Sequence, residues 1–310
     1  MPTPIADHLV RHLTLRQLQI FEAVVRLGGY TRAAETLHLT QPTVSAQIKK
    51  LTDSLGVPLL EQVGRSVQPT EAGRDVFLAA QEILGRVAAL GEATAERERV
   101  VKGPLHIAVV TTGKYFMPHL LGAFIDRHPQ VIPHLTVTNR ARVLQRARSG
   151  EDDLLIMGQV PGELPVEAVP FLDNELVVVA PPNHPLVGER NITLERLSRE
   201  RFLVREPGSG TRQAMDRLFA SHDLKIHPYM ELGSSEAVKQ GVIAGLGLSV
   251  ISIHNLRMEL AGGHLVVLDV EGFPLQRRWY AVHLKNKHLS LAARTFLQFI
   301  LEESREVLAH

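Results

Sequence analysis

The stretch YTRAAETLHLTQPTVSAQIK, Tyr30–Lys49, contains two short helical patterns separated by a turn. In the first pattern, the small residues Ala33 and Ala34 allow a second helix to approach closely. The second pattern starts at Thr40, whose hydroxyl is suited to cap a helix, and Pro42 follows in the first turn, where a missing N–H costs little. The stretch therefore predicts a helix-turn-helix.

The second helix of this pair has two distinct faces. Val44, Ile48 and Leu51 repeat at helical spacing and are expected to face the core. The opposite face carries short hydrogen-bonding side chains near its start, suited to base edges, and lysines further along, suited to phosphates. This composition is typical of a DNA recognition helix, although two amphipathic helices with a solvated outer face would show a similar pattern.

Flanking segments complete a small domain. A preceding helix, with Leu15, Leu18, Phe21, Val24 and Val25 on one face, ends at Gly28-Gly29. After the second helix, residues 57–69 predict a short β-hairpin, or wing. We therefore expect a winged helix-turn-helix domain, otherwise all-α, over residues 1–70, where Lys and Arg outnumber Asp and Glu by seven to five.

The candidate DNA-binding residues lie on the two helices and at the tip of the wing. A tip arginine can enter or flank a minor groove, and its alternative is simple solvation. The candidates are Thr31, Arg32, Thr40, Gln41, Pro42, Thr43, Ser45, Gln47, Lys49, Lys50 and Arg65.

One long helix is expected to follow, over residues 71–102. Val76, Ala80, Ile83, Val87 and Leu90 alternate in steps of four and three, the spacing of a coiled-coil seam. Polar residues flank this narrow row, which favours a homodimer over a helix that lies on its own domain. A dimer would present two recognition helices to a pseudo-palindromic site.

Residues 103–310 alternate between strand and helix patterns and predict an α/β domain. The expected strands are 105–110, 132–137, 153–156, 174–180, 202–204, 248–253 and 265–269. The expected helices are 115–128, 143–149, 211–221, 236–244 and 291–308.

Three strand-to-helix junctions of this domain share one chemistry. Each offers hydroxyls and backbone N–H groups at a helix N-terminus, where the helix dipole favours an anion. Ordinary helix capping explains any one junction, but three together with several arginines predict a site for a small anionic effector. The candidate effector-binding residues are Thr111, Thr112, Gly113, Lys114, Arg140, Arg205, Thr211, Arg212, Ser234, Ser235 and Glu236.

Composition and missing motifs exclude several classes of protein. The 310 residues include no Cys, which removes disulfides and thiolate chemistry, and no run approaches the roughly 18 apolar residues of a membrane span. Neither phosphate-binding glycine motif is complete, G-x-S-x-G is absent, and the fifteen His form no H-E-x-x-H. We therefore expect a soluble cytoplasmic protein that is not an enzyme, with no catalytic residues, cofactor, metal site or membrane partner.

The N-terminal segment resembles the DNA-binding domain of LysR-type transcriptional regulators. The similarity rests on F-x-A-V-x-x-L-G-G-Y-T-R-A-A-E-x-L-x-L-T-Q-P-T-V-S-x-Q-I-K-K-L from Phe21, followed by L-G-V-P-L-L-E-Q and P-T-E-A-G. Gly29 departs from the Ser more common in that family. The resemblance implies dimerisation through the linker helix, a homotetramer, promoter DNA and RNA polymerase as partners, and an effector domain like periplasmic binding proteins. Its lobe I would comprise about 103–162 and 282–310, and lobe II about 163–281, with crossovers near 161–166 and 278–284.

Three further segments, Thr111–Pro118, Arg205–Arg212 and Met230–Val250, resemble the CbbR branch of this family, the regulators of Calvin-cycle (RubisCO) operons. This resemblance implies a transcriptional regulator of carbon-fixation genes, an activator, that responds to a phosphorylated metabolite. One alternative is a LysR-type regulator of another pathway with a carboxylate effector. An alternative of another class is a solute-binding protein without a role on DNA.

Overall fold

The computed structural model describes residues 13–63, 66–95, 100–285 and 287–309. It comprises two compact units, one formed mainly by residues before Val101 and the other mainly by residues from Val101 onward. Within the described ranges, no helix is both long and apolar enough to cross a lipid bilayer.

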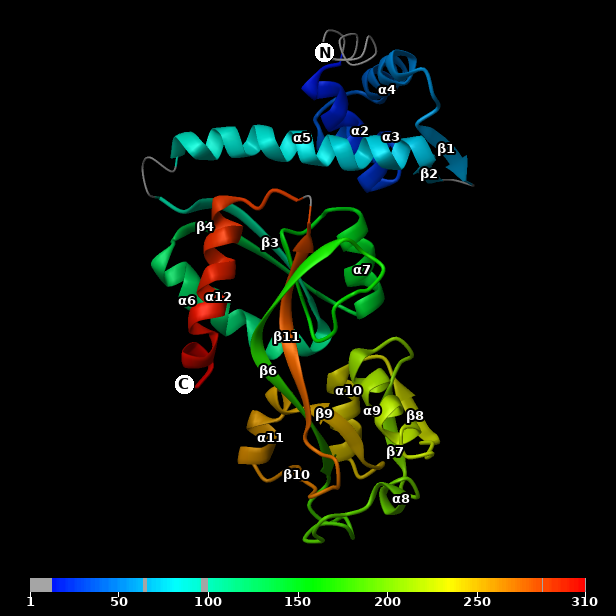
Figure 1. Ribbon diagram of the computed structural model, residues 1–310, viewed down its shortest axis with the longest axis vertical. Coiled ribbons are helices and arrows are strands. Elements are labelled where there is room, and N and C mark those ends of the chain that lie inside the picture. Colours follow the sequence, from blue (N-terminus) through cyan, green and yellow to red (C-terminus); the bar gives the residue numbers. More distant parts are fainter. Residues whose placement is uncertain (1–12, 64–65, 96–99, 286, 310) are drawn as a thin grey trace. The chain divides into compact units, whose positions relative to one another are not determined.

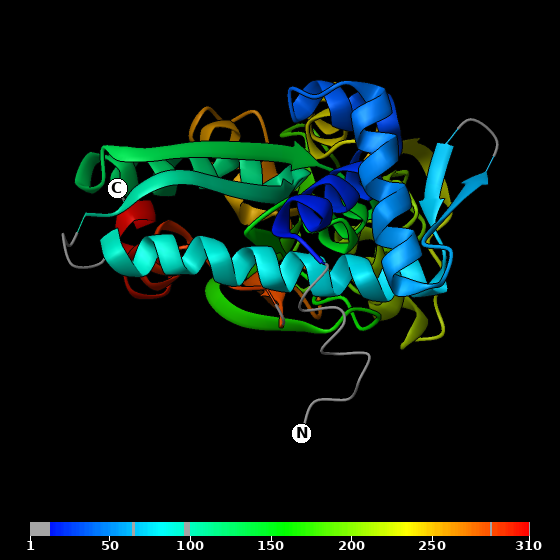
Figure 2. The same ribbon diagram turned by 90° about the horizontal axis from the view of Figure 1, so that it is seen from above.

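The N-terminal unit is a winged helix-turn-helix (Figures 1 and 2). Its elements are α2 (Leu15–Leu27), α3 (Tyr30–Thr36), α4 (Gln41–Leu55), β1 (Leu60–Val63), β2 (Ser66–Pro69) and α5 (Glu71–Ala95). The two strands pair in antiparallel register from Leu60–Pro69 to Val63–Ser66. The hairpin predicted over residues 57–69 is therefore confirmed.

Local caps fix the ends of these helices. Thr14 forms a capping box with Gln17 at the start of α2, and Gly28 ends that helix with a φ of 68°. Thr40 caps α4 as expected, accepting a hydrogen bond from the Thr43 amide at 3.4 Å. Gly56 ends α4 with a φ of 70°, a conformation that favours glycine.

The core of this unit contains the residues that define both helical patterns. Ala33 and Ala34 of α3 are buried against Val44, Ile48 and Leu51 of α4. The prediction that Leu15 faces the core is wrong, because Leu15 lies exposed at the start of α2. Within α2 the buried side chains are Gln17, Leu18, Ile20, Phe21, Ala23 and Val24.

The linker helix differs in two respects from the prediction. Helix α5 ends at Ala95, and Lys102, expected to be helical, is the first residue of a strand. The apolar row is also not uniform: Ala80 is buried, whereas Ile83, Val87 and Leu90 are 40%, 44% and 72% exposed. The first part of the row thus packs within the chain, and the second part is exposed to solvent.

The C-terminal unit is built on a seven-stranded mixed sheet. Its order is β10-β6-β11-β5-β3-β4, with β9 also paired to β6, and a separate two-stranded sheet joins β7 to β8. The strands are β3 (Lys102–Val110), β4 (Gln130–Thr138), β5 (Leu154–Met157), β6 (Val166–Ala180), β7 (Phe202–Arg205), β8 (Pro228–Leu232), β9 (Ser249–Ser252), β10 (Val266–Val267) and β11 (Leu275–Leu284).

Helices cover both parts of this unit. They are η2 (Thr111–Tyr115), α6 (Met117–Arg127), α7 (Arg140–Arg148), α8 (Leu194–Leu197), α9 (Gly210–Ala220), α10 (Ser235–Ile243), η3 (Ile253–Asn255), α11 (Arg257–Ala261) and α12 (Leu291–Ala309). The helix expected over 115–128 is divided, because a 3₁₀ turn precedes α6.

Two long strands join the two lobes of the C-terminal unit. β6 and β11 pair in antiparallel register from Val166–Leu284 to Leu176–Leu275 and run from one lobe into the other (Figure 1). The pairing shifts between Trp279 and Tyr280, opposite the segment that contains Pro170. The strands β8 and β11 and the first half of β6 were not predicted from the sequence, yet the expected two-lobed α/β architecture is confirmed.

Candidate functional site

The outward face of α4 is the candidate DNA-reading surface. Gln41, Thr43 and Ser45 are exposed near its start, with Thr40 and Pro42 beside them, and Lys49 and Lys50 are exposed further along, whereas Gln47 is half-buried. The Thr43 hydroxyl lies 2.8 Å from that of Thr40 and so supports the cap. Short polar groups are therefore presented ahead of cations on one face, the order that base edges and phosphates require.

The other candidate DNA contacts have different surroundings. Thr31 and Arg32 are exposed on α3, and Arg32 Nη2 donates to the Gly28 carbonyl at 3.3 Å. That bond satisfies an end of α2, so Arg32 has a structural role in addition to any contact with phosphate. Arg65 lies outside the described residues.

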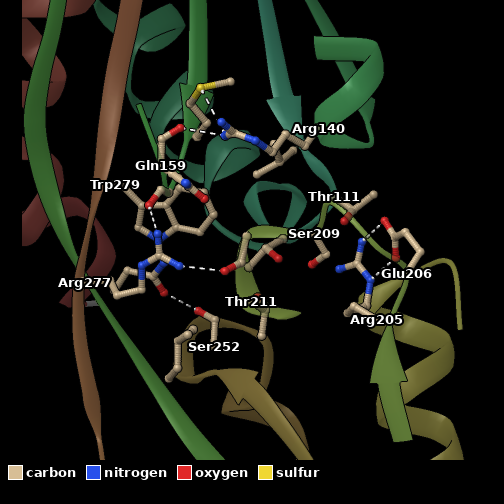
Figure 3. Close-up of a pocket in the computed structure, with 17 residues that line it drawn as sticks. Thr111, Arg140, Gln159, Arg205, Glu206, Ser209, Thr211, Ser252, Arg277 and Trp279 are labelled. Atoms are coloured by element: carbon tan, nitrogen blue, oxygen red, sulfur yellow. Dashed lines mark hydrogen bonds and ion pairs between the residues drawn. The ribbon is translucent and has the colours of Figure 1, made fainter. Parts of the chain in front are cut away.

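A pocket of the C-terminal unit brings together side chains from both lobes (Figure 3). It encloses about 530 Å³, its open mouth included. Five of the residues expected to bind the effector line it: Thr111, Thr112, Arg140, Arg205 and Thr211. The lining residues that were not predicted from the sequence include Gln159, Asn174, Glu206, Ser209, Ser252, Arg277 and Trp279.

Two arginines of the pocket are held by neutral acceptors only. Arg140 Nη1 donates to the Gln159 carbonyl at 2.7 Å. Arg277 donates from Nη1 to the Gly210 carbonyl and from Nη2 to the Gly158 carbonyl, each at 2.7 Å. No ion pair among the described residues includes either guanidinium, and the charge of Glu163 acts on Arg140 without forming such a pair.

The pKa values of these two groups reflect the same situation. Burial lowers the pKa of the Arg140 guanidinium, against a weaker attraction to Glu163. Burial also lowers the pKa of Arg277, and the charges of Arg217 and Arg140 lower it further. Because arginine titrates far above neutrality, both groups stay charged, and an anion in the pocket would relieve their repulsion.

The remaining two predicted arginines are already paired. Arg205 Nε and Nη2 donate to the Glu206 carboxylate at 2.7 and 2.8 Å, and Arg205 Nη1 donates to the Ser235 hydroxyl at 2.5 Å. Arg212 Nε pairs with the Asp216 carboxylate at 2.8 Å and does not line the pocket. The positive potential of the pocket therefore comes mainly from Arg140 and Arg277.

Two polar atoms of the lining residues have no hydrogen-bond partner within the described chain: Gln159 Oε1 and Trp279 Nε1. The Trp279 side chain is 2% exposed, so water does not easily replace a missing partner. A buried polar group without a partner costs about 1–3 kcal/mol. A ligand that bonded to either atom would recover part of that free energy.

The other predicted effector residues lie in a contact between the lobes. Ser235 Oγ lies 3.3 Å from Thr112 Oγ1. Tyr115 donates to the Glu236 carboxylate, which also lies 3.1 Å from Lys239 Nζ and 3.9 Å from Lys114 Nζ. Gly113, Lys114, Ser234, Ser235 and Glu236 do not line the pocket; Ser234 caps α10 and accepts from the Ala237 amide.

Burial and charge shift the pKa values of two groups in this contact. Burial and the hydrogen bond to Glu236 raise the pKa of Tyr115 to about 12. Burial acts to raise the pKa of Glu236, but hydrogen bonds from Tyr115, Gln240 and Lys239 lower it to about 2. A neutral phenol and an ionised carboxylate thus face each other across the lobes over the physiological pH range.

Both units match known family models. Residues 15–74 match the bacterial regulatory helix-turn-helix protein, lysR family, and residues 98–305 match the LysR substrate binding domain. The chain belongs to the LysR family of transcriptional regulators. The N-terminal unit is therefore the family's helix-turn-helix domain, with α4 as the second helix of that motif, and the C-terminal unit is the family's substrate-binding domain rather than an enzyme.

Several members of the LysR family are similar over nearly the whole chain. The HTH-type transcriptional activator CmpR of Synechocystis is 45% identical over 298 residues, 96% of this chain and 98% of that protein. The RuBisCO operon transcriptional regulator of Allochromatium vinosum is 48% identical over 293 residues, 94% of this chain and 97% of that protein.

Solved structures agree with this assignment. The regulatory domain of CcmR from Synechocystis PCC6803, in complex with 2-PG, is 44% identical, with a TM-score of 0.64 over 66% of this chain and 98% of that chain. A point variant of full-length OxyR from Pseudomonas aeruginosa is 25% identical, with a TM-score of 0.77 over 95% of both chains.

Proposed function

We propose that this LysR-family protein regulates a carbon-fixation operon in the cytoplasm in response to a small phosphorylated carboxylic acid. The names of its relatives support the pathway, because the Allochromatium vinosum protein is a RuBisCO operon regulator. The regulatory domain solved with 2-PG supports the class of ligand. The abbreviation 2-PG denotes 2-phosphoglycolate.

The observation that carries the proposed ligand class is the pair Arg140 and Arg277. Both guanidiniums line one pocket, both are partly desolvated, and neither forms an ion pair among the described residues. Guanidinium groups suit the oxygens of phosphate and carboxylate, and a ligand with both groups can engage two arginines at once. Thr111, Thr112 and Thr211 supply hydroxyls in the same lining.

On DNA, we assign base reading to the start of α4 and phosphate contacts to its later part. Gln41, Thr43 and Ser45 are the exposed hydrogen-bonding groups, and Lys49 and Lys50 are the cations. Thr31, Arg32, Thr40, Pro42, Gln47 and Arg65 complete the proposed contact set. These assignments support sequence-specific binding to double-stranded promoter DNA.

The open part of α5 supports assembly. Ile83, Val87 and Leu90 form an exposed apolar row at coiled-coil spacing, and a second copy of α5 would cover it. We assign the homodimer to this contact and a homotetramer to pairing of two such dimers. We also propose that the protein acts as an activator and contacts RNA polymerase at its promoter.

The ligand would act by shifting an equilibrium between two arrangements of the lobes. Arg277 lies on β11, a strand that joins the lobes, and donates to Gly158 in one lobe and Gly210 in the other. An anion at this guanidinium would bind more tightly to one arrangement than to the other, which is the condition for coupling to DNA. The bend of the promoter DNA would change as a result.

The proposal is tested by calorimetry on the full-length protein. We expect 2-phosphoglycolate to bind, and both glycolate and inorganic phosphate to bind much more weakly, because each retains only one of the two anionic groups. Equal binding of glycolate would indicate a carboxylate effector and a different pathway. Absence of heat with all three compounds would contradict the proposed ligand class.

A further inference from the structure

One short segment of the C-terminal unit belongs both to a pocket and to the contact between the lobes. η2 follows β3 in one lobe, and its first two residues line the pocket that contains Arg140 and Arg277 (the effector pocket). Its last two residues, Lys114 and Tyr115, line a separate cavity and contact the start of α10 in the other lobe. A displacement of η2 therefore changes the pocket and the lobe contact together.

Glu236, in the first turn of α10, receives donors from both lobes. The Tyr115 hydroxyl donates to its carboxylate, and Lys114 Nζ lies 3.9 Å away. From α10 itself, Lys239 Nζ lies at 3.1 Å and Gln240 Nε2 donates at 3.0 Å. Because Glu236 is ionised, with a pKa of about 2, the bond from Tyr115 is charge-assisted. The Glu236 carboxylate is thus the acceptor through which this contact joins the lobes.

A second set of bonds crosses the lobes between this contact and the effector pocket. Arg205 Nη1 donates to the Ser235 hydroxyl at 2.5 Å, and Ser235 Oγ lies 3.3 Å from Thr112 Oγ1. Glu206 accepts from the other two nitrogens of this guanidinium and so fixes its direction (Figure 3). Arg205 and Thr112 line the effector pocket, whereas Ser235 does not. The lobe contact is therefore continuous with the pocket lining.

The contact between Tyr115 and Glu236 can open at low cost because water replaces its bonds. The side chains of Glu236 and Lys114 are each 39% exposed, and polar contacts between partly exposed groups contribute little net stability. A contact of this kind suits an equilibrium between two lobe arrangements that a small ligand can shift.

We propose that Tyr115 and Glu236 are positioning residues for the effector pocket: their bond holds the lobes in the arrangement that binds the ligand, although neither residue lines that pocket. The inference deepens the proposed function and rests on it for the identity of the ligand, 2-phosphoglycolate. The apparent affinity of a ligand scales with the fraction of protein in the binding arrangement. Loss of the bond should therefore weaken ligand binding without any change at the ligand's own contacts.

Tyr115→Phe tests the bond because it removes the donor and keeps the ring, whose centre lies 5.0 Å from Lys114 Nζ and 4.9 Å from Lys239 Nζ. By calorimetry on the full-length protein, this variant should bind 2-phosphoglycolate about three- to tenfold more weakly, the size of one partly exposed hydrogen bond. Tyr229→Phe is the matched control, because Tyr229 is exposed on β8 and lines neither cavity. Its affinity should equal that of the unmodified protein.

A double-mutant cycle shows whether the two residues act through each other. Glu236→Ala should weaken 2-phosphoglycolate by a factor similar to that of Tyr115→Phe, and the double variant should lose no more than the larger single loss. Glu236→Gln retains an acceptor oxygen and should recover part of the affinity. A general loss of structure would instead give losses that add, without recovery in Glu236→Gln.

The arrangement of the lobes can also be measured without ligand. The chain contains no Cys, so Asp126→Cys on α6 and Lys225→Cys in the other lobe place two spin labels at exposed positions. Dilution with unlabelled protein removes distances between copies. By pulsed EPR, ligand-free Tyr115→Phe should populate a second inter-lobe distance more than the labelled protein without this change. Saturating 2-phosphoglycolate should restore the same distance distribution in both.

Three results would overturn the proposal. They are an unchanged affinity for 2-phosphoglycolate in Tyr115→Phe, unchanged ligand-free distances in that variant, and losses of affinity that add in the double variant. Failure of the unmodified protein to bind 2-phosphoglycolate would contradict the proposed function, and the ligand-free distances would still decide the role of Tyr115. The two claims can thus fail independently.

Discussion

Glu206 holds Arg205 in a two-pronged ion pair, with its carboxylate oxygens 2.7 and 2.8 Å from Nε and Nη2. The charge of Arg205 is therefore compensated next to the pocket that it lines. Arg277, held only by the carbonyls of Gly158 and Gly210, has no such partner among the described residues. The charges of Arg205 and Arg277 are thus compensated to different extents. The affinity for an anionic ligand should therefore depend more on Arg277 than on Arg205.

The first prediction concerns Arg277. Arg277→Met should weaken 2-phosphoglycolate binding roughly 10- to 100-fold, because it removes a charge-assisted hydrogen bond of about 1.5–3 kcal/mol. Arg212→Met is the matched control, since Arg212 pairs with Asp216 outside the pocket and its loss should change affinity less than about threefold. Calorimetry measures the affinity of both variants for 2-phosphoglycolate. Equal losses of affinity would contradict the claim that Arg277, and not Arg212, supplies positive charge to the pocket.

A second prediction separates base reading from phosphate contact on α4. Gln41→Ala should reduce the preference for operator over random DNA, because this side chain is exposed where base edges are read. Lys50→Ala should weaken binding to both DNAs and reduce the slope of log K against log salt by about one. Lys225→Ala, an exposed lysine of the C-terminal unit, should change neither.

Fluorescence anisotropy with the two DNAs at several salt concentrations measures these effects. If Gln41→Ala lowered operator and random-DNA affinity to the same extent, its side chain would not read bases. The salt slope of Lys50→Ala independently tests the phosphate contact.

The third prediction concerns the open row on α5. The double variant Ile83→Asp and Leu90→Asp should dissociate the dimer, since two carboxylates in an apolar seam cannot be desolvated at low cost. Leu78→Asp is the control, because Leu78 is also exposed but lies about 200° around the helix from Val76. Sedimentation should show a smaller species for the double variant only, and an unchanged species would exclude this row as the interface.

A fourth prediction follows from Glu236, whose pKa is lowered from 4.5 to about 2 in the folded protein. A lowered carboxyl pKa stabilises the fold above the unfolded value, and this contribution is lost as the pH falls from 4.5 towards 2. Glu236→Gln should therefore unfold at lower urea concentration than the unmodified protein at neutral pH. The difference should shrink as the pH is lowered through that window.

The pKa of Tyr115 is raised to about 12, so its effect on the pH dependence of stability is opposite to that of Glu236. Its contribution is complete below the ordinary value of 10 and is lost only as the pH rises towards 12. The stability difference of Glu236→Gln should therefore be constant between about pH 5 and 9. Glu189→Gln, an exposed control, should lack the acid dependence, and a Glu236→Gln difference that persisted at about pH 2 would contradict the account.

Local patterns were sufficient for the DNA-binding unit. The cap at Thr40 and the spacing of Val44, Ile48 and Leu51 depend on residues a few positions apart, and the structure contains both. Leu15 was misplaced because its position at the first turn of α2 leaves it outside the core despite suitable spacing. Helix periodicity alone does not show where the neighbouring helices end.

The pocket depends on long-range pairing that sequence spacing does not reveal. Arg277 reaches it only because β11 pairs with β5 and β6 across more than a hundred residues of sequence. Arg277 and Trp279 lie two residues apart and therefore share one face of that strand. The adjacent Arg278 points to the other face, so two consecutive arginines hid this alternation in the sequence. Thr112 and Lys114 are similarly close in sequence, yet they line different cavities.

The most direct test of the account is a footprint on the promoter DNA of a carbon-fixation operon, titrated with 2-phosphoglycolate, for the unmodified protein and Arg277→Met. The account predicts that the ligand changes the extent of protection or the bend of DNA bound by the unmodified protein. Arg277→Met should protect the same DNA without responding at the same ligand concentration. An equal response of both proteins, or no response of the unmodified protein, would contradict a regulator that senses a phosphorylated acid through Arg277.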